Sequence, residues 1–181
     1  MTEKQILQWI KTNLSPIIDK AISDSQPVMY TTDWLAAMAM REVNFLIARH
    51  ADKPLDTVSK LMKGDYGQRA GEKAKQYHGY SFFQIDIASF PDFINSGDWQ
   101  DPYKSCMKAI SVLEGKRKYI QSKLPNLSGN DLNRAITAAY NCGEGRVVQA
   151  LNKGVDVDTY THNHDYSKEV FRYRGIYNSL K

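Results

Sequence analysis

The segment from Thr32 to about Ala48 restricts the fold more than any other part of the chain. It begins with Thr32-Asp33, residue types that favour a helix N-terminus, and continues with helical spacing. Almost every side of this predicted helix is apolar, and its large apolar residues include Trp34, Leu35, Met38 and Met40. A helix without a polar face has to be surrounded by other elements, so we expect it to be central and buried.

Glu42 lies inside this apolar helix, between Met40 and Phe45. Burying an ionised carboxyl group is costly, and burial raises the pKa of such a group. A carboxyl group with a raised pKa can serve as a general acid near neutral pH. From the residues alone, the alternatives are an ion pair with Arg41, Arg49 or a lysine elsewhere, or a side chain that points at water.

The residues before this helix predict another amphipathic helix, which Pro16 kinks or splits. The apolar residues that recur at steps of three and four are Ile6, Leu7, Trp9, Ile10, Leu14, Ile17, Ile18, Ala21 and Ile22. A break is expected from Ser23 to Pro27. The chain has 181 residues and no linker-like tract, so we expect one globular unit. Within it, we interpret residues 1–30 as a helical extension packed on a domain of residues 31–181.

The segment that follows the central helix predicts a small irregular or hairpin region. Pro54 favours the start of a short helix over Leu55–Met62. Loops and turns are marked by Gly64, Gly67 and Gly71. Residues 79–87 are aromatic and β-branched, which is typical of a short strand, and we expect this strand to turn into a helix.

The second half of the chain predicts a series of helices. Asp101-Pro102 is typical of a helix start, and the apolar face that follows it continues to Leu124. Ser128 and Asp131 resemble a capping box at the start of the next helix, which should end at Gly143. The remaining segments are a short helix over 144–151, a polar loop over 152–163, and a last helix that carries Val170, Tyr173 and Tyr177. The fold class is therefore mostly α (α+β), with a minor β element before the middle.

Composition and segment lengths argue against two kinds of partner. The formal net charge of +4 favours polyanions, but the basic residues are dispersed and no nucleic-acid-binding motif accompanies them. No apolar run approaches the roughly 20 residues of a membrane span, and no signal-peptide pattern follows Met1. We expect neither nucleic-acid binding nor membrane insertion. Export would need a non-standard route or a leader that is not part of this sequence.

No metal or other cofactor is expected. The residues that invite a metal site are His78, His162, His164, Asp156 and Asp158, and they lack the spacing of zinc ligands. Cys106 and Cys142 are too few for a disulfide scaffold. We interpret both as small apolar side chains in the interior, with a single disulfide bridge as the alternative.

Three motifs in a fixed order point to a function. Residues 139–145, Ala-Tyr-Asn-Cys-Gly-Glu-Gly, resemble the Ala-Tyr-Asn-Ala-Gly-x-Gly signature of goose-type lysozymes and lytic transglycosylases. Residues 42–45, Glu-Val-Asn-Phe, are similar to the Glu-Ser-x-Phe motif that holds the catalytic acid of this superfamily. Residues 79–86 resemble the Gly-x-Gly-Leu-Met-Gln-Val-Asp segment of goose-type lysozymes, with Ser81 in the place of the second glycine. The resemblance covers roughly residues 32–177 and is closest to the goose type.

The resemblance implies a lysozyme-like fold with a central buried helix, a small β-hairpin region and a long groove for a glycan. It implies that Glu42 is the general acid and that Asp86, together with Asp65, positions a water molecule. It also implies a set of substrate-binding residues: Gln84, Tyr140, Asn141, Phe82, and Tyr166, which would close over Glu42.

Without the resemblance, several of these residues have structural interpretations. Gln84 can tie a strand to a helix, and Asp86 can be the N-cap of a following helix. Asp65 can form a turn, and Tyr166 can be an ordinary core residue. Asp86 can be an N-cap and position a water molecule at the same time.

The implied reaction is cleavage of peptidoglycan glycan strands between N-acetylmuramic acid and N-acetylglucosamine. Because Asp86 is present, inverting hydrolysis is favoured over the lytic transglycosylase reaction, in which the muramyl 6-hydroxyl attacks and leaves 1,6-anhydromuramic ends. A non-catalytic wall-binding module and an unrelated helical interaction protein are the alternatives from other classes. The hypothesis places a monomeric enzyme at the cell wall, in the periplasm or outside the cell, with a protein inhibitor or immunity protein as a further conceivable partner.

Overall fold

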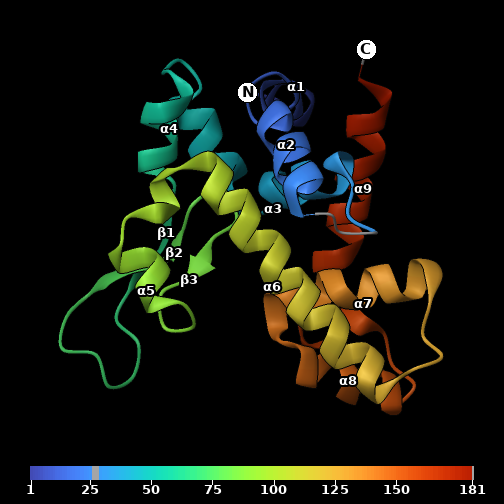
Figure 1. Cartoon of the computed structure of the whole chain (residues 1–181). Coiled ribbons are helices and arrows are strands. Elements are labelled where there is room, and N and C mark those ends of the chain that lie inside the picture. The colour runs from blue at the N-terminus through green and yellow to red at the C-terminus, as the bar shows by residue number, and fades with distance from the viewer. Residues whose placement is uncertain (26–28, 181) are drawn as a thin grey trace.

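The computed structural model of the chain describes residues 1–25 and 29–180 (Figure 1). The described part is mostly helical and contains one small three-stranded antiparallel sheet, so the predicted fold class is confirmed. In chain order its elements are α1 Glu3–Asn13, α2 Ser15–Ser25, α3 Thr32–His50, α4 Leu55–Leu61, β1 Lys63–Gly67, β2 Gln76–Tyr80, β3 Ile85–Asp86, α5 Pro91–Asn95, η1 Asp98–Gln100, α6 Pro102–Lys123, α7 Gly129–Cys142, α8 Glu144–Asn152, η2 Val157–Tyr160, η3 His162–His164 and α9 Tyr166–Ser179. Among the described helices, none combines the length and the apolar character that a membrane crossing needs.

Helix α3 is the centre of the fold, as predicted. Its side chains from Trp34 to Met40 are buried, and it packs against α1, α2 and α9. The buried Trp34 indole donates a hydrogen bond to Thr137 Oγ1 of α7, at 3.1 Å. One feature was not predicted: at Val43 the backbone leaves helical geometry, with φ −134° and ψ 21°, so α3 consists of two helical segments.

The N-terminal residues form two helices that meet at Leu14. Pro16 is the second residue of α2, where its missing N–H group leaves no helical hydrogen bond unmade. The apolar faces of both helices join the same core cluster as α3. The break expected from Ser23 is wrong in its first part, because α2 continues to Ser25, and the rest of it lies outside the described residues.

The β region differs from the sequence prediction in two ways. Gly64 and Gly67 lie within strand β1, and only Gly71 lies in a loop, with φ +88°. Gly64 pairs with Gly79 of β2, and a Cβ atom on either glycine would lie 2.2 or 2.4 Å from Gln84 Oε1. The two glycines therefore permit the close approach of a side chain and do not mark a turn.

Residues 79–87 do not form a strand that turns into a helix. The chain leaves β2 after Tyr80, reverses direction through residues 81–84 and returns as β3, and the next helix begins only at Pro91. The reversal uses two non-glycine residues in the left-handed region, Ser81 with φ +71° and Gln84 with φ +46°.

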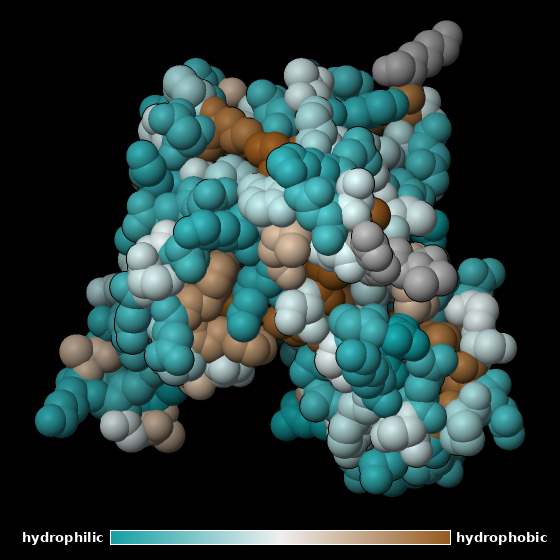
Figure 2. Space-filling view, viewed as in Figure 1, coloured by the Kyte–Doolittle hydropathy of each residue, from teal (hydrophilic) through white to brown (hydrophobic). Residues whose placement is uncertain are grey.

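Two lobes extend from the core formed by α1, α2, α3 and α9 (Figure 1). We call the sheet with α4, α5 and η1 the β lobe, and α7 with α8 the helical lobe. Helix α6 crosses from one lobe to the other, and its start is capped as predicted, since Asp101 accepts hydrogen bonds from the N–H groups of Tyr103 and Lys104. In the space-filling view the surface is hollowed between the two lobes (Figure 2).

The helical lobe corrects two further expectations. Ser128 occupies the N-cap position of α7 but its side chain makes no capping hydrogen bond, because Gly129, with φ +56°, alters the entry into the helix. The helix ends at Gly143, as predicted. The predicted polar loop over 152–163 contains the short helix η2, the first two residues of η3 and the fully buried Asp158.

Asp158 fixes the start of α9. Its carboxylate accepts hydrogen bonds from Ser167 N at 2.8 Å, Ser167 Oγ at 2.6 Å and Lys168 N at 3.2 Å. Arg134 Nη2 lies 3.5 Å away and offsets its charge. The first turn of α9 is therefore capped by a residue that lies eight positions before the helix begins.

We expect Asp158→Ala to destabilise the fold by about 3 kcal/mol, because it leaves N–H groups in the first turn of α9 and the buried Ser167 hydroxyl without their acceptor. Urea unfolding followed by circular dichroism measures this loss. The matched change Asp52→Ala removes an exposed carboxylate and should cost less than ~0.5 kcal/mol. Equal effects of the two substitutions would contradict the capping role.

Candidate active site

Glu42 is the last residue of α3 before the helical geometry breaks at Val43. Its side chain is half-buried, so its carboxyl group is surrounded by protein yet within reach of the surface. The hydroxyl group of Tyr166, the first residue of α9, donates a hydrogen bond to Glu42 Oε1. The contact between Tyr166 and Glu42 that the motif resemblance implies is therefore present.

The surroundings of Glu42 shift its pKa in a direction that suits an acid. Burial raises the pKa of the carboxyl group, while the hydrogen bond from Tyr166 and the charge of Arg41 lower it. Burial outweighs the other two, and the pKa rises to about 7. At neutral pH the carboxyl group is therefore protonated in a large fraction of the molecules.

Tyr166 is held firmly in place. Its ring is buried, and the guanidinium carbon of Arg41 lies 5.5 Å from the ring centroid. Arg41 in turn forms ion pairs with Asp165 at 3.4 Å and with Glu169 at 3.0 Å, both on or next to α9. Tyr166 is thus both a core residue and the hydrogen-bond donor of the site.

Tyr140 joins the two lobes beside Glu42. Its hydroxyl group donates a hydrogen bond to the carbonyl oxygen of Phe83 at 2.8 Å, which ties the end of α7 to the 81–84 turn of the β lobe. Burial, and after it the nearby charge of Glu42, raises the pKa of Tyr140 well above its usual value. Glu42, Tyr140 and Tyr166 therefore come together where the two lobes are joined.

Asn141 and Gln84 are partly committed to structural hydrogen bonds. Asn141 is exposed, and its Oδ1 accepts from His162 N at 2.9 Å. The Gln84 amide donates to Ser81 O at 3.0 Å and lies against the glycine pair of the hairpin. Gln84 therefore holds the 81–84 turn against the two hairpin strands. The expectation that Gln84 links a strand to a helix is wrong.

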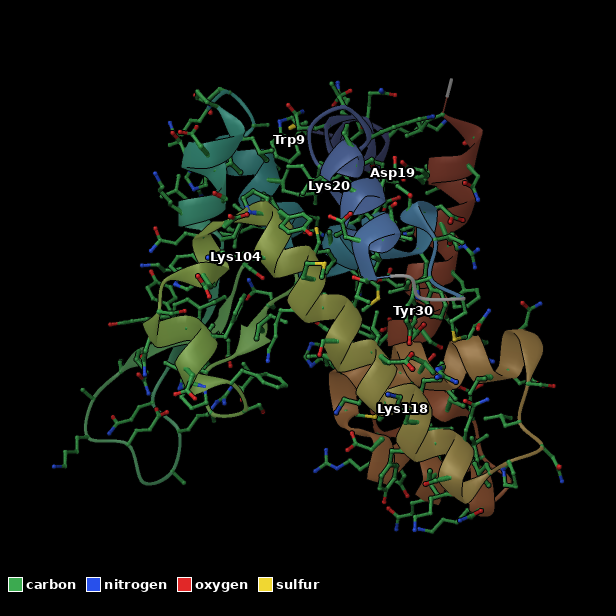
Figure 3. All side chains as sticks on the ribbon, viewed as in Figure 1. Trp9, Asp19, Lys20, Tyr30, Lys104 and Lys118 are labelled. Carbon is green, nitrogen blue, oxygen red and sulfur yellow. The ribbon has the colours of Figure 1, made fainter. Side chains whose placement is uncertain are left out.

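The expectation that Phe82 binds substrate is wrong. Its side chain has no exposed surface and belongs to the core, where its ring centroid lies 6.3 Å from that of Trp9 (Trp9 is labelled in Figure 3). The adjacent Phe83 is fully buried as well, so both aromatic side chains of the 81–84 turn belong to the core. Phe83 contributes only its carbonyl group to the site.

Asp65 and Asp86 are brought together, but around an arginine. Arg69 Nη1 donates to Asp86 Oδ1 at 2.6 Å, and Arg69 Nη2 donates to Asp65 Oδ2 at 2.8 Å. Asp86 Oδ2 accepts two further hydrogen bonds, from Ser89 N and Ser89 Oγ, each at 3.0 Å. Burial alone would raise the pKa of Asp86, but the hydrogen bonds from Arg69 and Ser89 outweigh burial and lower it.

The expected N-cap role of Asp86 is also wrong as stated. Its hydrogen bond from Ser89 N closes a turn, whereas α5 begins at Pro91 with Phe90 in the cap position. Arg69 was not singled out from the sequence. The only available signal was its position four residues after Asp65, a spacing common to many surface ion pairs.

A buried histidine supports the loop that carries Arg69. His78 Nδ1 hydrogen-bonds the carbonyl oxygen of Asp65 at 2.7 Å, and Nε2 lies 2.9 Å from Glu72 Oε1. Glu72 also accepts from the backbone N–H of Arg69 at 2.7 Å. Hydrogen bonds from Arg69 and then His78 lower the pKa of Glu72 to about 2, and Glu72 raises the pKa of His78.

The described residues contain no group of three or more His, Cys, Asp or Glu side chains that could hold a metal ion. Cys106 is buried and Cys142 is half-buried, and both are free thiols. No protein-family model matches the chain, and no curated protein matches it.

Tyr166→Phe should raise the pKa of Glu42 further, because the lost hydrogen bond favours the ionised form. Carbon-13 NMR of glutamate-labelled protein, titrated over the pH range around neutrality, measures this pKa. Tyr177→Phe is the matched control, since Tyr177 donates its buried hydroxyl hydrogen bond to Ser15 and not to the site. A Glu42 pKa that falls or stays constant in Tyr166→Phe would refute the role of the hydrogen bond.

Glu42→Gln should stabilise the protein relative to wild type as the pH rises. A carboxyl group with a raised folded-state pKa contributes stability below its unfolded pKa of 4.5 and loses it as the pH rises through about 7. The difference in unfolding free energy should grow by about 3 kcal/mol between about pH 4 and about pH 8. Glu3→Gln is the control with the opposite sign, because a hydrogen bond from Arg172 lowers the pKa of Glu3.

Proposed function

We propose that this protein cleaves the glycan strands of peptidoglycan between N-acetylmuramic acid and N-acetylglucosamine, with Glu42 as the general acid. The observation that carries the proposal is the environment of Glu42. The carboxyl group is half-buried where two lobes meet, receives one hydrogen bond from a fixed tyrosine and has a pKa of about 7. Glycoside cleavage needs such a group to protonate the departing oxygen.

The reaction begins with proton transfer from Glu42 to the glycosidic oxygen. The bond between that oxygen and C1 of the muramyl residue breaks, and the oxygen leaves as the 4-hydroxyl group of N-acetylglucosamine. Glu42 becomes a carboxylate, which the hydrogen bond from Tyr166 stabilises. Tyr140 and Asn141, at the end of α7, would contact the sugar through the groups that remain free.

Ser81 supports the motif resemblance on which the substrate assignment depends. It stands where the goose-type segment has its second glycine, and its φ of +71° lies in the region that favours glycine. The local backbone is therefore of the kind that a glycine motif would produce. Phe83 next to it supplies the carbonyl oxygen that anchors Tyr140.

Either of two alternative second steps can complete the reaction. In hydrolysis, a water oxygen bonds to C1 and its proton passes to Asp86. In the transglycosylase reaction, the muramyl O6 bonds to C1 and its proton returns to Glu42. The hydrogen bonds that Asp86 accepts from Arg69 and Ser89 favour the transglycosylase route, because that route needs only Glu42.

A wall-binding module without activity is less well supported by the site. Placing Glu42 where its ionised form is disfavoured lowers stability at neutral pH, and glycan binding alone does not require this.

The net charge of +4 would attract the enzyme to an anionic wall in the periplasm or outside the cell.

Digestion of purified peptidoglycan, with mass analysis of the released muropeptides, tests the proposal. The wild type should release muropeptides, and Glu42→Gln should reduce the rate by about 10²–10⁴-fold, because the acid is lost while the shape is kept. Glu3→Gln, a matched change on the surface of α1, should have no effect. Equal activity of Glu42→Gln and wild type would refute Glu42 as the acid, and co-sedimentation with the wall without any cleavage would indicate a binding module.

A further inference from the structure

Arg69 links the two carboxylates to which the hydrolytic route would assign the attacking water. One guanidinium group donates to Asp86 with one nitrogen and to Asp65 with the other, at 2.6 and 2.8 Å. The second oxygen of Asp86 is occupied by Ser89. A water molecule poised for attack would have to compete with these donors for the same oxygens.

The loop between β1 and β2 is organised to hold this arginine. The backbone N–H of Arg69 is bound by Glu72, and Glu72 is bound by the buried His78. His78 also fixes the carbonyl group of Asp65, from which the Arg69 loop departs. Contacts at both the backbone and the side chain of Arg69 therefore fix the position of its guanidinium group, as expected for a group whose position matters.

We propose that Arg69 is a specificity-determining residue, which withholds Asp86 from water and so directs the cleaved glycan toward internal attack by the muramyl 6-hydroxyl. This inference rests on the proposed function. In the route that Arg69 favours, O6 bonds to C1 and its proton returns to Glu42, so no water is consumed. In the route that it suppresses, a water oxygen bonds to C1 and Asp86 accepts the water proton.

The pKa shifts of Glu42 and Asp86 agree with proton return to Glu42 and not to Asp86. After the first proton transfer Glu42 is the conjugate base of a group with a pKa of about 7, and it can take a proton from a hydroxyl group. The pKa of Asp86 is lowered by Arg69 and Ser89 despite burial, which makes Asp86 a weak base.

The test measures the ratio of reducing to 1,6-anhydromuramic ends that the full-length protein releases from purified peptidoglycan. Wild type should release mainly anhydro ends, which are lighter by one water. Arg69→Met should raise the ratio of reducing to anhydro ends by at least about tenfold, because it frees a base. Adding Asp86→Asn to Arg69→Met should reverse that rise. The ratio does not depend on the total rate, so a general loss of activity cannot imitate the result.

Arg172 offers a closely matched control. Its side chain is 45% exposed against 44% for Arg69, and it also pairs with two carboxylates, Glu3 at 2.7 Å and Glu169 at 3.4 Å. Arg172→Met should leave the product ratio unchanged. Arg69→Lys keeps the charge but can no longer bind both carboxylates with one planar group, so an intermediate ratio is expected.

A second readout does not depend on turnover. Carbon-13 NMR titration of Asp86 should show a higher pKa in Arg69→Met than in wild type, because the hydrogen bond from Arg69 is lost, and circular dichroism checks that the variant is folded.

The outcomes separate the two proposals. Cleavage by wild type that yields mainly reducing ends, or an unchanged ratio in folded Arg69→Met, would overturn the role of Arg69 and leave Glu42 as the acid. An Asp86 pKa that does not move would overturn it as well. No cleavage by wild type would overturn the proposed function and this inference together.

Discussion

A carboxyl group in the central helix is the constraint on which the rest of the site depends. Helix α3 is buried on every side from Trp34 to Met40, and Glu42 follows this buried run after one residue. The break at Val43 lets Glu42 end one helical segment, and α9 supplies Tyr166 as its hydrogen-bond partner. Asp158 fixes the first turn of α9 and thereby the position of Tyr166. A residue far from Glu42 in sequence thus helps to hold the hydrogen-bond partner of Glu42.

The lobes meet through one hydrogen bond that serves both fold and site. Tyr140 connects the end of α7 to the carbonyl group of Phe83, and the same ring lies beside Glu42. The turn that provides this carbonyl group is held from the other side by Gln84, which lies over Gly64 and Gly79. The turn is therefore anchored by its Phe83 carbonyl group and by the buried Phe82 side chain, whereas Asp65 and Asp86 form a separate arrangement with Arg69.

The parts of the fold that could be predicted from the sequence are those that depend on near neighbours. The buried character of α3, the split at Pro16 and the cap at Asp101 follow from local spacing and residue type. The pairing of Gly64 with Gly79 and the buried Asp158 depend on contacts between distant segments, so local patterns suggested a turn and a polar loop instead. Motif resemblance located Glu42, Tyr140, Asp65 and Asp86, but it could not show that Phe82 is buried or that an arginine lies between the two aspartates.

The surroundings of Glu42 and of Asp86 shift the pKa values of the two carboxyl groups in opposite directions. Glu42 belongs to the core helix, where burial dominates and its pKa rises, whereas Asp86 belongs to the β lobe, where Arg69 and Ser89 lower its pKa. Environments that separate two carboxyl groups in this way assign them different roles. Glu42 is held at the end of a helical segment of α3 by its hydrogen bond from Tyr166. The state of Asp86 depends on Arg69, which lies on an exposed loop between β1 and β2. Substitutions in that loop can therefore change the surroundings of Asp86 while those of Glu42 and the core remain the same.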